Sequence, residues 1–118
     1  MANKTFHDIM KANWTLDTGR DFDGDFDITI SLGDQTMGAV CLSEDAALAM
    51  AEVLEKRYYF SAPSLITDDV RIHTQRDFDG DRIITISEQN LTVAEVMLTK
   101  SGAKLLAQQI RNQLGVEG

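Results

Sequence analysis

The hexapeptide Arg-Asp-Phe-Asp-Gly-Asp occurs twice in this chain, as residues 20–25 and again as residues 76–81. With this offset of 56 held without gaps, residues 14–58 and 70–114 are identical at 16 of 45 positions. Unrelated segments of average composition would share roughly 3 identities over that length. Because the identities continue well beyond the hexapeptide, two hairpin turns of independent origin do not account for them. The sequence therefore predicts a tandem duplication within a single domain of 118 residues.

Each copy has the pattern of three β-strands followed by an α-helix. In the first copy, apolar and polar residues alternate around Leu16 and Ile28, as in strands with one buried face. The apolar spacing then changes to three and four residues over 47–58, and Ser43 is placed to cap this helix. The second copy repeats the pattern, with Thr99 in the place of Ser43.

These patterns predict an α+β domain built as a tandem duplication of a β-β-β-α unit, with an antiparallel sheet of up to six strands and two helices on one face. The first repeat spans about residues 12–58, a link spans 59–67, and the second repeat spans about 68–115. Two three-stranded halves related by a pseudo-twofold axis would satisfy the same pattern. Apolar spacing over residues 6–10 predicts a short N-terminal helical turn.

The alternation also predicts the length of the loops that hold the hexapeptide. Residues that face each other across an antiparallel pair lie on the same side of the sheet. A two-residue Asp-Gly loop, which is a common hairpin signal, would set core positions opposite solvent positions. A loop with an odd number of residues places core positions opposite core positions and solvent positions opposite solvent positions. Five residues (21–25) would place Leu16 opposite Ile30, and three residues (23–25) are the alternative.

Acidic residues gather at these two loops. The chain has 19 Asp and Glu against 11 Lys and Arg, a formal net charge of −8. Carboxylates in contact repel by roughly 1 kcal/mol per pair in water, so clusters of them are not selected for stability. We expect these aspartates to dock on a basic protein partner, while solvated tips that prevent edge-to-edge aggregation are the plain alternative. The candidate residues are Asp21, Asp23, Asp25, Asp27, Asp77, Asp79 and Asp81.

The same aspartates suggest calcium binding as an alternative function. Asp21, Asp23 and Asp25 alternate as ligands do at the start of an EF-hand loop. The rest of that motif is missing, because the glycine is fourth rather than sixth and the twelfth residue is Leu32. Arg82 also places a cation next to the second set. No metal ligand is therefore assigned.

Apolar residues on the second face of the predicted sheet suggest that something covers it. On a background of Thr and Ser, such residues are typical of a buried contact. We expect a homodimer interface there, and a homodimeric structural protein is a further alternative function. The candidate interface residues are Met37, Cys41, Ile83, Val93 and Met97.

Several classes of protein fit the sequence poorly. The acidic balance disfavours direct nucleic-acid binding and attachment to anionic membranes. The sequence shows no apolar run long enough for a membrane span and no signal-peptide pattern, and its single cysteine, Cys41, fits a reducing cytoplasm. With two histidines and no phosphate-binding loop or paired Cys-x-x-Cys, we expect neither catalytic residues nor a cofactor.

The sequence thus favours a small, acidic, non-enzymatic binding protein of the cytoplasm that acts as an inhibitor or adaptor. Its partner would be a basic protein. A protein that handles nucleic acid fits that charge, as with phage- or plasmid-encoded anti-defence inhibitors, although this step is an analogy from charge and size.

Overall fold

A computed structural model describes residues 5–20, 23–56 and 59–115. The first half contains strands β1 (Phe6–His7), β2 (Trp14–Arg20), β3 (Phe26–Leu32) and β4 (Gln35–Leu42), followed by helix α1 (Glu44–Lys56). The second half contains strands β5 (Phe60–Pro63), β6 (Val70–Arg76), β7 (Arg82–Glu88) and β8 (Leu91–Leu98), followed by helix α2 (Lys100–Gln113). Ser43 and Thr99 cap the two helices, as expected, by accepting the N–H groups of Ala46 and Gly102.

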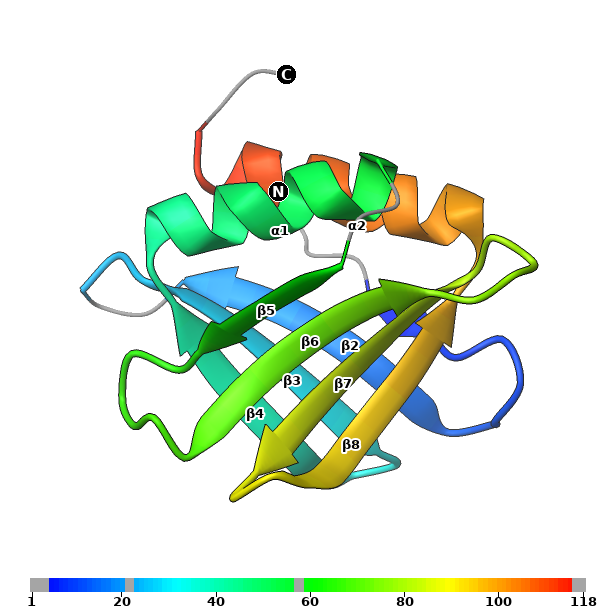
Figure 1. The fold of residues 1–118 in the computed structure, drawn as a ribbon, viewed down its shortest axis with the longest axis horizontal. Helices are drawn as coiled ribbons and strands as arrows, with labels where there is room; N and C mark the ends of the chain where they lie inside the picture. Colours follow the sequence, from blue (N-terminus) through cyan, green and yellow to red (C-terminus); the bar gives the residue numbers. More distant parts are fainter. Residues whose placement is uncertain (1–4, 21–22, 57–58, 116–118) are drawn as a thin grey trace.

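The strands form two antiparallel sheets, in the orders β1-β2-β3-β4 and β5-β6-β7-β8. The sheets stack on each other, and the two helices lie side by side at one end of the stack (Figure 1). Helix α1 contacts β4 of the first sheet and β5 and β6 of the second, and α2 contacts β2 and β8. The α+β class is confirmed. The single sheet of up to six strands with both helices on one face is wrong, because alternation specifies which side of a strand is buried but not which strands share a sheet.

Two short edge strands were not expected from the sequence. Strand β1 replaces the predicted N-terminal helical turn: Phe6 is buried and pairs with Leu16, while Ile9 and Met10 are exposed. Strand β5 occupies part of the predicted link 59–67. Each sheet gains its fourth strand in this way.

Both hairpins that carry the hexapeptide have five-residue loops. Arg20 pairs with Phe26 at the end of β2, and Arg76 pairs with Arg82 at the end of β6. Leu16 lies opposite Ile30, as a five-residue loop requires. The predicted odd loop is therefore confirmed in its longer form.

Residues 56 positions apart meet where the two halves pack. In the helix layer, Glu55 Oε1 lies 2.5 Å from Arg111 Nη2. Between the sheets, Gly38 of β4 lies against β8, and a Cβ atom built on Gly38 would lie 3.2 Å from the Cβ atom of Ala94. Two pairs of residues with the same sequence offset as the repeated hexapeptide therefore lie close together.

The two halves share one hydrophobic core. It combines buried residues of both sheets and both helices, from Phe6 to Leu114. In the part of the chain that the structure describes, neither helix has the length and apolar content that a membrane crossing needs.

Candidate functional site

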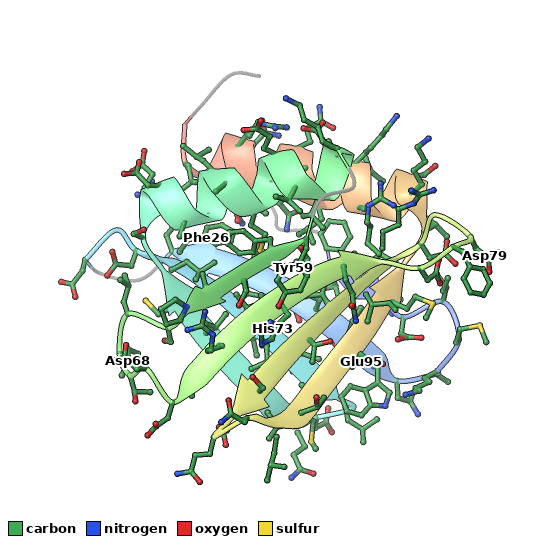
Figure 2. The ribbon with its side chains drawn as sticks, in the orientation of Figure 1. Phe26, Tyr59, Asp68, His73, Asp79 and Glu95 are labelled. Atoms are coloured by element: carbon green, nitrogen blue, oxygen red, sulfur yellow. The ribbon has the colours of Figure 1, made fainter. Side chains whose placement is uncertain are left out.

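The two copies of the hexapeptide form two separate acidic loops, which we call the first tip (residues 21–25, between β2 and β3) and the second tip (residues 77–81, between β6 and β7). The described part of the first tip and the second tip lie at opposite sides of the molecule (Figure 1), and Asp79 marks the second tip in Figure 2. Their acids therefore do not merge into one patch. Asp21 lies outside the described residues. The other candidate aspartates are exposed or half-buried: Asp23, Asp25, Asp27, Asp77, Asp79 and Asp81.

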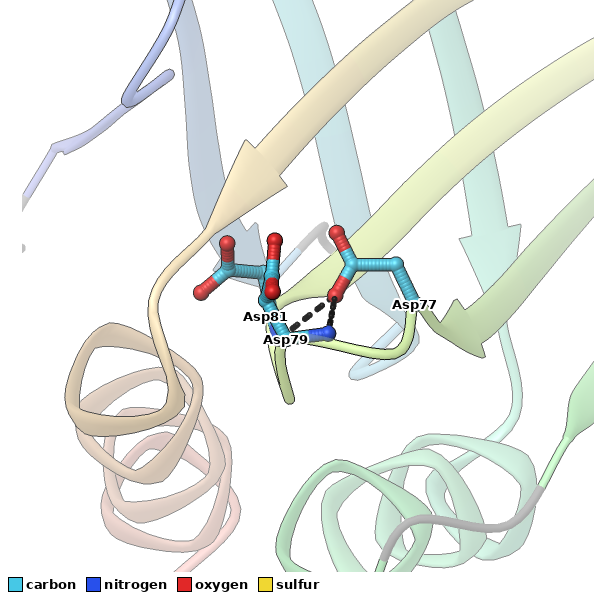
Figure 3. Close-up of side chains that lie close together, drawn as sticks. All are labelled: Asp77, Asp79 and Asp81. Atoms are coloured by element: carbon cyan, nitrogen blue, oxygen red, sulfur yellow. Dashed lines mark hydrogen bonds between the residues drawn. The ribbon is translucent and has the colours of Figure 1, made fainter.

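The second tip is held by hydrogen bonds within the loop. Asp77 Oδ1 accepts the backbone N–H groups of Asp79 at 2.9 Å and Asp81 at 3.0 Å (Figure 3). The Asp77 N–H donates to the Asp81 carbonyl at 3.0 Å, and the Gly80 N–H donates to the Asp77 carbonyl at 3.2 Å. Gly80 has a φ of 90°, a conformation that other L-residues rarely adopt. The loop therefore has a defined shape.

This shape brings three carboxylates together. Among the described residues, Asp77, Asp79 and Asp81 form a cluster in which one carboxylate oxygen from each lies within 4.8 Å of the others (Figure 3). Asp79 is exposed, while Asp77 and Asp81 are half-buried. Mutual repulsion among the three carboxylates raises the free energy of the cluster, so the binding of a cationic group there would be favoured.

Arg82 lies at the base of the second tip and is almost fully buried, with 2% of its surface exposed. Its Nη1 donates to the Gly80 carbonyl, and its Nε donates at 3.0 Å to the carbonyl of Leu54 in the last turn of α1. A cation is favoured at this end of a helix because the carbonyl dipoles point toward it. Arg82 thus fastens the second tip to the helix of the other half.

Arg20 fastens the first tip in a related way. Its Nε and Nη2 donate to the Gly24 carbonyl at 3.1 and 2.6 Å, and its Nη1 donates at 3.3 Å to the carbonyl of Gln113, the last residue of α2. Its Nη2 also lies 3.7 Å from Glu44 Oε2. The arginine that holds each tip therefore reaches the helix of the other half, but it precedes the loop in one copy and follows it in the other.

An exposed aromatic ring stands between the acids of the second tip. Phe78 is 97% exposed. It lines an open hollow of about 800 Å³, the Phe78 hollow, together with Tyr59, Gln75 and Ile83, next to Arg76 and Asp77. We did not predict Phe78 or Tyr59 as functional residues. The signal for Phe78 was available, because a phenylalanine inside a five-residue acidic loop has no core to enter.

A second hollow of about 260 Å³, the His73 hollow, adjoins the first on the outer face of the second sheet. Tyr59 and Gln75 line both, and His73 and Glu95 belong to the second (Figure 2). The Thr85 hydroxyl donates to Glu95 Oε2 at 3.4 Å. The two hollows together form a continuous surface from the second tip to the middle of the sheet.

The side chains of two neighbouring residues hydrogen-bond to the imidazole ring of His73. Tyr59 Oη lies 2.8 Å from His73 Nδ1, and Ser87 Oγ lies 3.5 Å from His73 Nε2. Burial, and after it the positive charge of Arg71, lowers the pKa of His73 below its usual 6.5. The imidazole is therefore neutral at pH 7 and adds no positive charge to the hollow.

Two of the predicted interface residues are half-buried for a reason within the chain. The pairing of β3 with β4 shifts between Ile30 and Ser31, and that of β7 with β8 shifts between Ile86 and Ser87. Each shift inserts one extra residue, which reverses the side that the strand pattern assigns to it. The inserted residues, Met37 and Val93, pack against the core.

The other three candidates lie in different surroundings. Cys41 is buried, and its main chain is bonded to the segment after β5, through the Ser64 hydroxyl at 3.2 Å and the Leu65 N–H at 2.8 Å. Its burial therefore does not require a second chain. Ile83 and Met97 face each other across β7 and β8 and are half-buried, and Ile83 lines the Phe78 hollow. A role for all five in an interface stays a prediction.

Any functional conclusion has to be drawn from the chain's own geometry and charge. The features that carry it are the acidic second tip, the exposed Phe78 and the two adjoining hollows. In the comparison with known proteins, no protein-family model and no curated protein matches this sequence.

Proposed function

We propose that this chain is a small, acidic, non-enzymatic binding protein of the cytoplasm, an inhibitor or adaptor that docks on a basic protein. The observation that carries the proposal is the second tip, where a hydrogen-bonded loop brings one carboxylate oxygen each of Asp77, Asp79 and Asp81 within 4.8 Å of one another. Such a cluster costs the fold electrostatic energy, and a basic partner offsets that cost on binding. A partner surface that handles nucleic acid has the required charge, as in anti-defence inhibition.

The second tip is the better candidate of the two. At the first tip, the Arg20 guanidinium bonds to the loop carbonyl of Gly24 and so places a positive charge beside Asp23 and Asp25. At the second tip, the fastening cation is Arg82, which is buried beneath the loop. The described residues of the first tip hold no cluster of three carboxylates like that of Asp77, Asp79 and Asp81, so we assign the second tip the larger share of partner binding.

The duplication is part of this proposal. We infer that the chain arose by tandem duplication of one unit, and the repeated register shifts between Ile30 and Ser31 and between Ile86 and Ser87 support this. The contact between Glu55 and Arg111, which are also 56 residues apart, supports it as well. Duplication supplies two tips, of which one can serve the fold while the other serves the partner.

Calcium binding by the second tip is a second candidate function, favoured by the same convergence of three carboxylates. Calcium takes six to eight oxygen ligands, and Asp77 Oδ1 is already engaged by two N–H groups. A calcium titration followed by melting temperature separates the two functions. A rise in melting temperature that is lost in a D77N/D79N/D81N variant supports calcium, and an unchanged melting temperature removes it.

The main test is affinity capture from a cell lysate, with captured proteins identified by mass spectrometry. The D77N/D79N/D81N variant removes three charges and keeps an acceptor oxygen at residue 77, so the loop bonds persist. The matched control is D34N/D68N/D69N, which removes three charges from exposed acids elsewhere. We expect a basic partner that is captured by the wild type and the control, lost in the second-tip variant, and weakened at high salt. Capture that is equal for all three proteins contradicts the proposal.

A further inference from the structure

We infer that the second tip and the two hollows beside it form one docking groove, which takes a basic segment of a partner protein with Phe78 as the apolar anchor. This inference rests on the proposed function. It adds the place of contact along the sheet and the kind of segment that fits there. We call this surface the Phe78 groove, and its residues are Tyr59, His73, Gln75, Phe78, Ile83 and Glu95.

The first step is the exposure of Phe78. A phenyl ring that is 97% exposed gives up the favourable burial that large apolar side chains normally gain in folding. Aromatic residues, phenylalanine among them, are enriched at the buried core of protein interfaces, and aromatic anchors in pockets carry much of the binding energy. Tyr59, with 62% of its surface exposed, and the half-buried Ile83 extend the apolar surface from Phe78.

The second step is the rigidity of the loop that presents this ring. The Asp77 carboxylate accepts two loop N–H groups, and Arg82 bonds to the Gly80 carbonyl from beneath. Loops that are already ordered before binding lose less conformational entropy when the complex forms. The backbone that carries Phe78 therefore has a defined conformation before binding, which favours Phe78 as an anchor residue.

The third step is the continuity of the surface. Strand pairing places Gln75 opposite Ile83, and His73 opposite Thr85, in adjacent rows on the outer face of the second sheet. Thr85 in turn lies opposite Glu95. Since Tyr59 and Gln75 line both hollows, a segment that covers Phe78 can continue over Tyr59 to Glu95.

The fourth step is the charge of the occupant. Asp77, Asp79 and Asp81 lie at one end of the groove and Glu95 lies toward the other, while the pKa of His73 is lowered so that it is neutral at pH 7. Even with Arg71 and Arg76 nearby, the acids are in the majority. A segment with lysine or arginine next to a large apolar side chain complements this surface.

The same charges disfavour a second copy of this chain as the occupant. An isologous dimer through the Phe78 groove would bring identical patches together. The aspartates at one end of the groove would then face acids of the other chain, either the same three aspartates or Glu95 toward the opposite end, in a protein that already carries a net charge of −8. A basic partner avoids this repulsion.

The experiment uses the full chain as bait for a phage-displayed library of random 12-residue peptides. Enriched peptides are synthesised, and their dissociation constants are measured by fluorescence anisotropy at 50 and 300 mM NaCl. We expect basic peptides that carry at least one large apolar residue and bind less tightly at the higher salt. Phe78→Ser should weaken binding by a factor of about 10 to 30.

The matched control is Leu91→Ser, which removes another exposed apolar side chain, at the first residue of β8 and at the far end of β7 from the second tip. It should bind the peptides like the wild type. Circular dichroism of both variants checks that they fold alike. A library without enriched peptides, enriched peptides that are not basic, or equal binding to Phe78→Ser and wild type would each overturn the inference.

Failure of the inference is distinguishable from failure of the proposed function. If D77N/D79N/D81N loses affinity for the basic peptides and Phe78→Ser does not, docking on the second tip stands and the Phe78 groove is wrong. If the triple variant binds as tightly as the wild type, the proposed function fails. Sedimentation of the chain alone covers the remaining occupant, because a dimer that Phe78→Ser dissociates would assign the Phe78 groove to self-association.

Discussion

Replacement of Arg82 tests whether this buried arginine stabilises the protein by linking the second tip to α1. Arg82 is 2% exposed, and its guanidinium bonds to the carbonyls of Gly80 and Leu54. The Leu54 carbonyl is among the last four of α1, which have no donor within the helix. Arg82→Met keeps most of the buried volume but removes both hydrogen bonds and the charge.

The expected loss of stability follows from these contacts. A hydrogen bond to a charged group contributes about 1.5–3 kcal/mol net, and neighbouring contributions are not fully additive. We therefore expect Arg82→Met to lower the free energy of unfolding by about 3 kcal/mol. Arg82→Ala should lower it by about 4–5 kcal/mol, because the shorter side chain also leaves a cavity.

Urea unfolding followed by circular dichroism measures this difference. With an m-value of about 2 kcal/mol/M, a loss of 3 kcal/mol moves the midpoint down by about 1.5 M. Arg76→Met is the matched control, since Arg76 pairs with Arg82 across the strands but is exposed, and it should change stability by less than about 0.5 kcal/mol. The opposite outcome is known in other proteins, where an apolar residue replaces a buried charge without loss of stability. An Arg82→Met variant as stable as the wild type would refute the reasoning.

Three further predictions concern the pH response, the sheet packing and the loop. Since burial and Arg71 lower the pKa of His73 below 6.5, the unfolded chain binds the proton more readily than the native one. His73 should therefore cost no stability well above pH 6.5, reduce stability as the pH falls from about 6.5 toward the lowered pKa, and cause no further loss below that pKa. The urea midpoint of His73→Gln should lack this decline, and an unchanged pH slope would contradict it. Gly38→Val should lower stability by about 2–3 kcal/mol, because a Cβ atom added at this position would lie only 3.1 Å from Ile86 Cγ2; a melting temperature equal to that of the wild type would disprove this packing. Asp77→Ala should cost about 1–2 kcal/mol through the loss of two acceptor bonds, whereas Asp77→Asn should stay within about 0.5 kcal/mol, and equal urea midpoints for the two variants would show that these bonds do not stabilise the loop.

The parts of the fold that the sequence predicts correctly depend on local patterns. The five-residue loops follow from the side on which Leu16 and Ile30 lie, and the helix starts follow from Ser43 and Thr99 as caps. The missed parts depend on contacts between distant segments. Strand β1 has two residues and β5 has four, too few to show alternation, and both are stabilised by pairing with a longer neighbour.

The candidate site was predictable in part for the same reason. The aspartates of the second tip stand in the sequence as a cluster, and the structure brings three of them together. The prediction of which residues lie on the outer face was less accurate. The extra residues Met37 and Val93 turn inward, and strict alternation does not reveal such bulges. The burial of Cys41 within its own chain could not be predicted from the strand pattern, because the segment that covers it follows more than twenty residues later.

The two tips have the same sequence but different surroundings, and the difference comes from the residue just after the hexapeptide. Phe26 follows the first tip, and at the equivalent position Arg82 follows the second, although both side chains are buried. Where phenylalanine occupies this place, Arg20 has to bond to the loop carbonyl and reach α2. Where arginine occupies it, Arg82 bonds from beneath to the loop carbonyl of Gly80 and to the carbonyl of Leu54 in α1, and Arg76 lines the Phe78 hollow. A single buried position therefore decides whether the flanking arginine bonds to the loop or lines the hollow beside it, while the convergence of Asp77, Asp79 and Asp81 is what leads us to propose partner binding at the second tip.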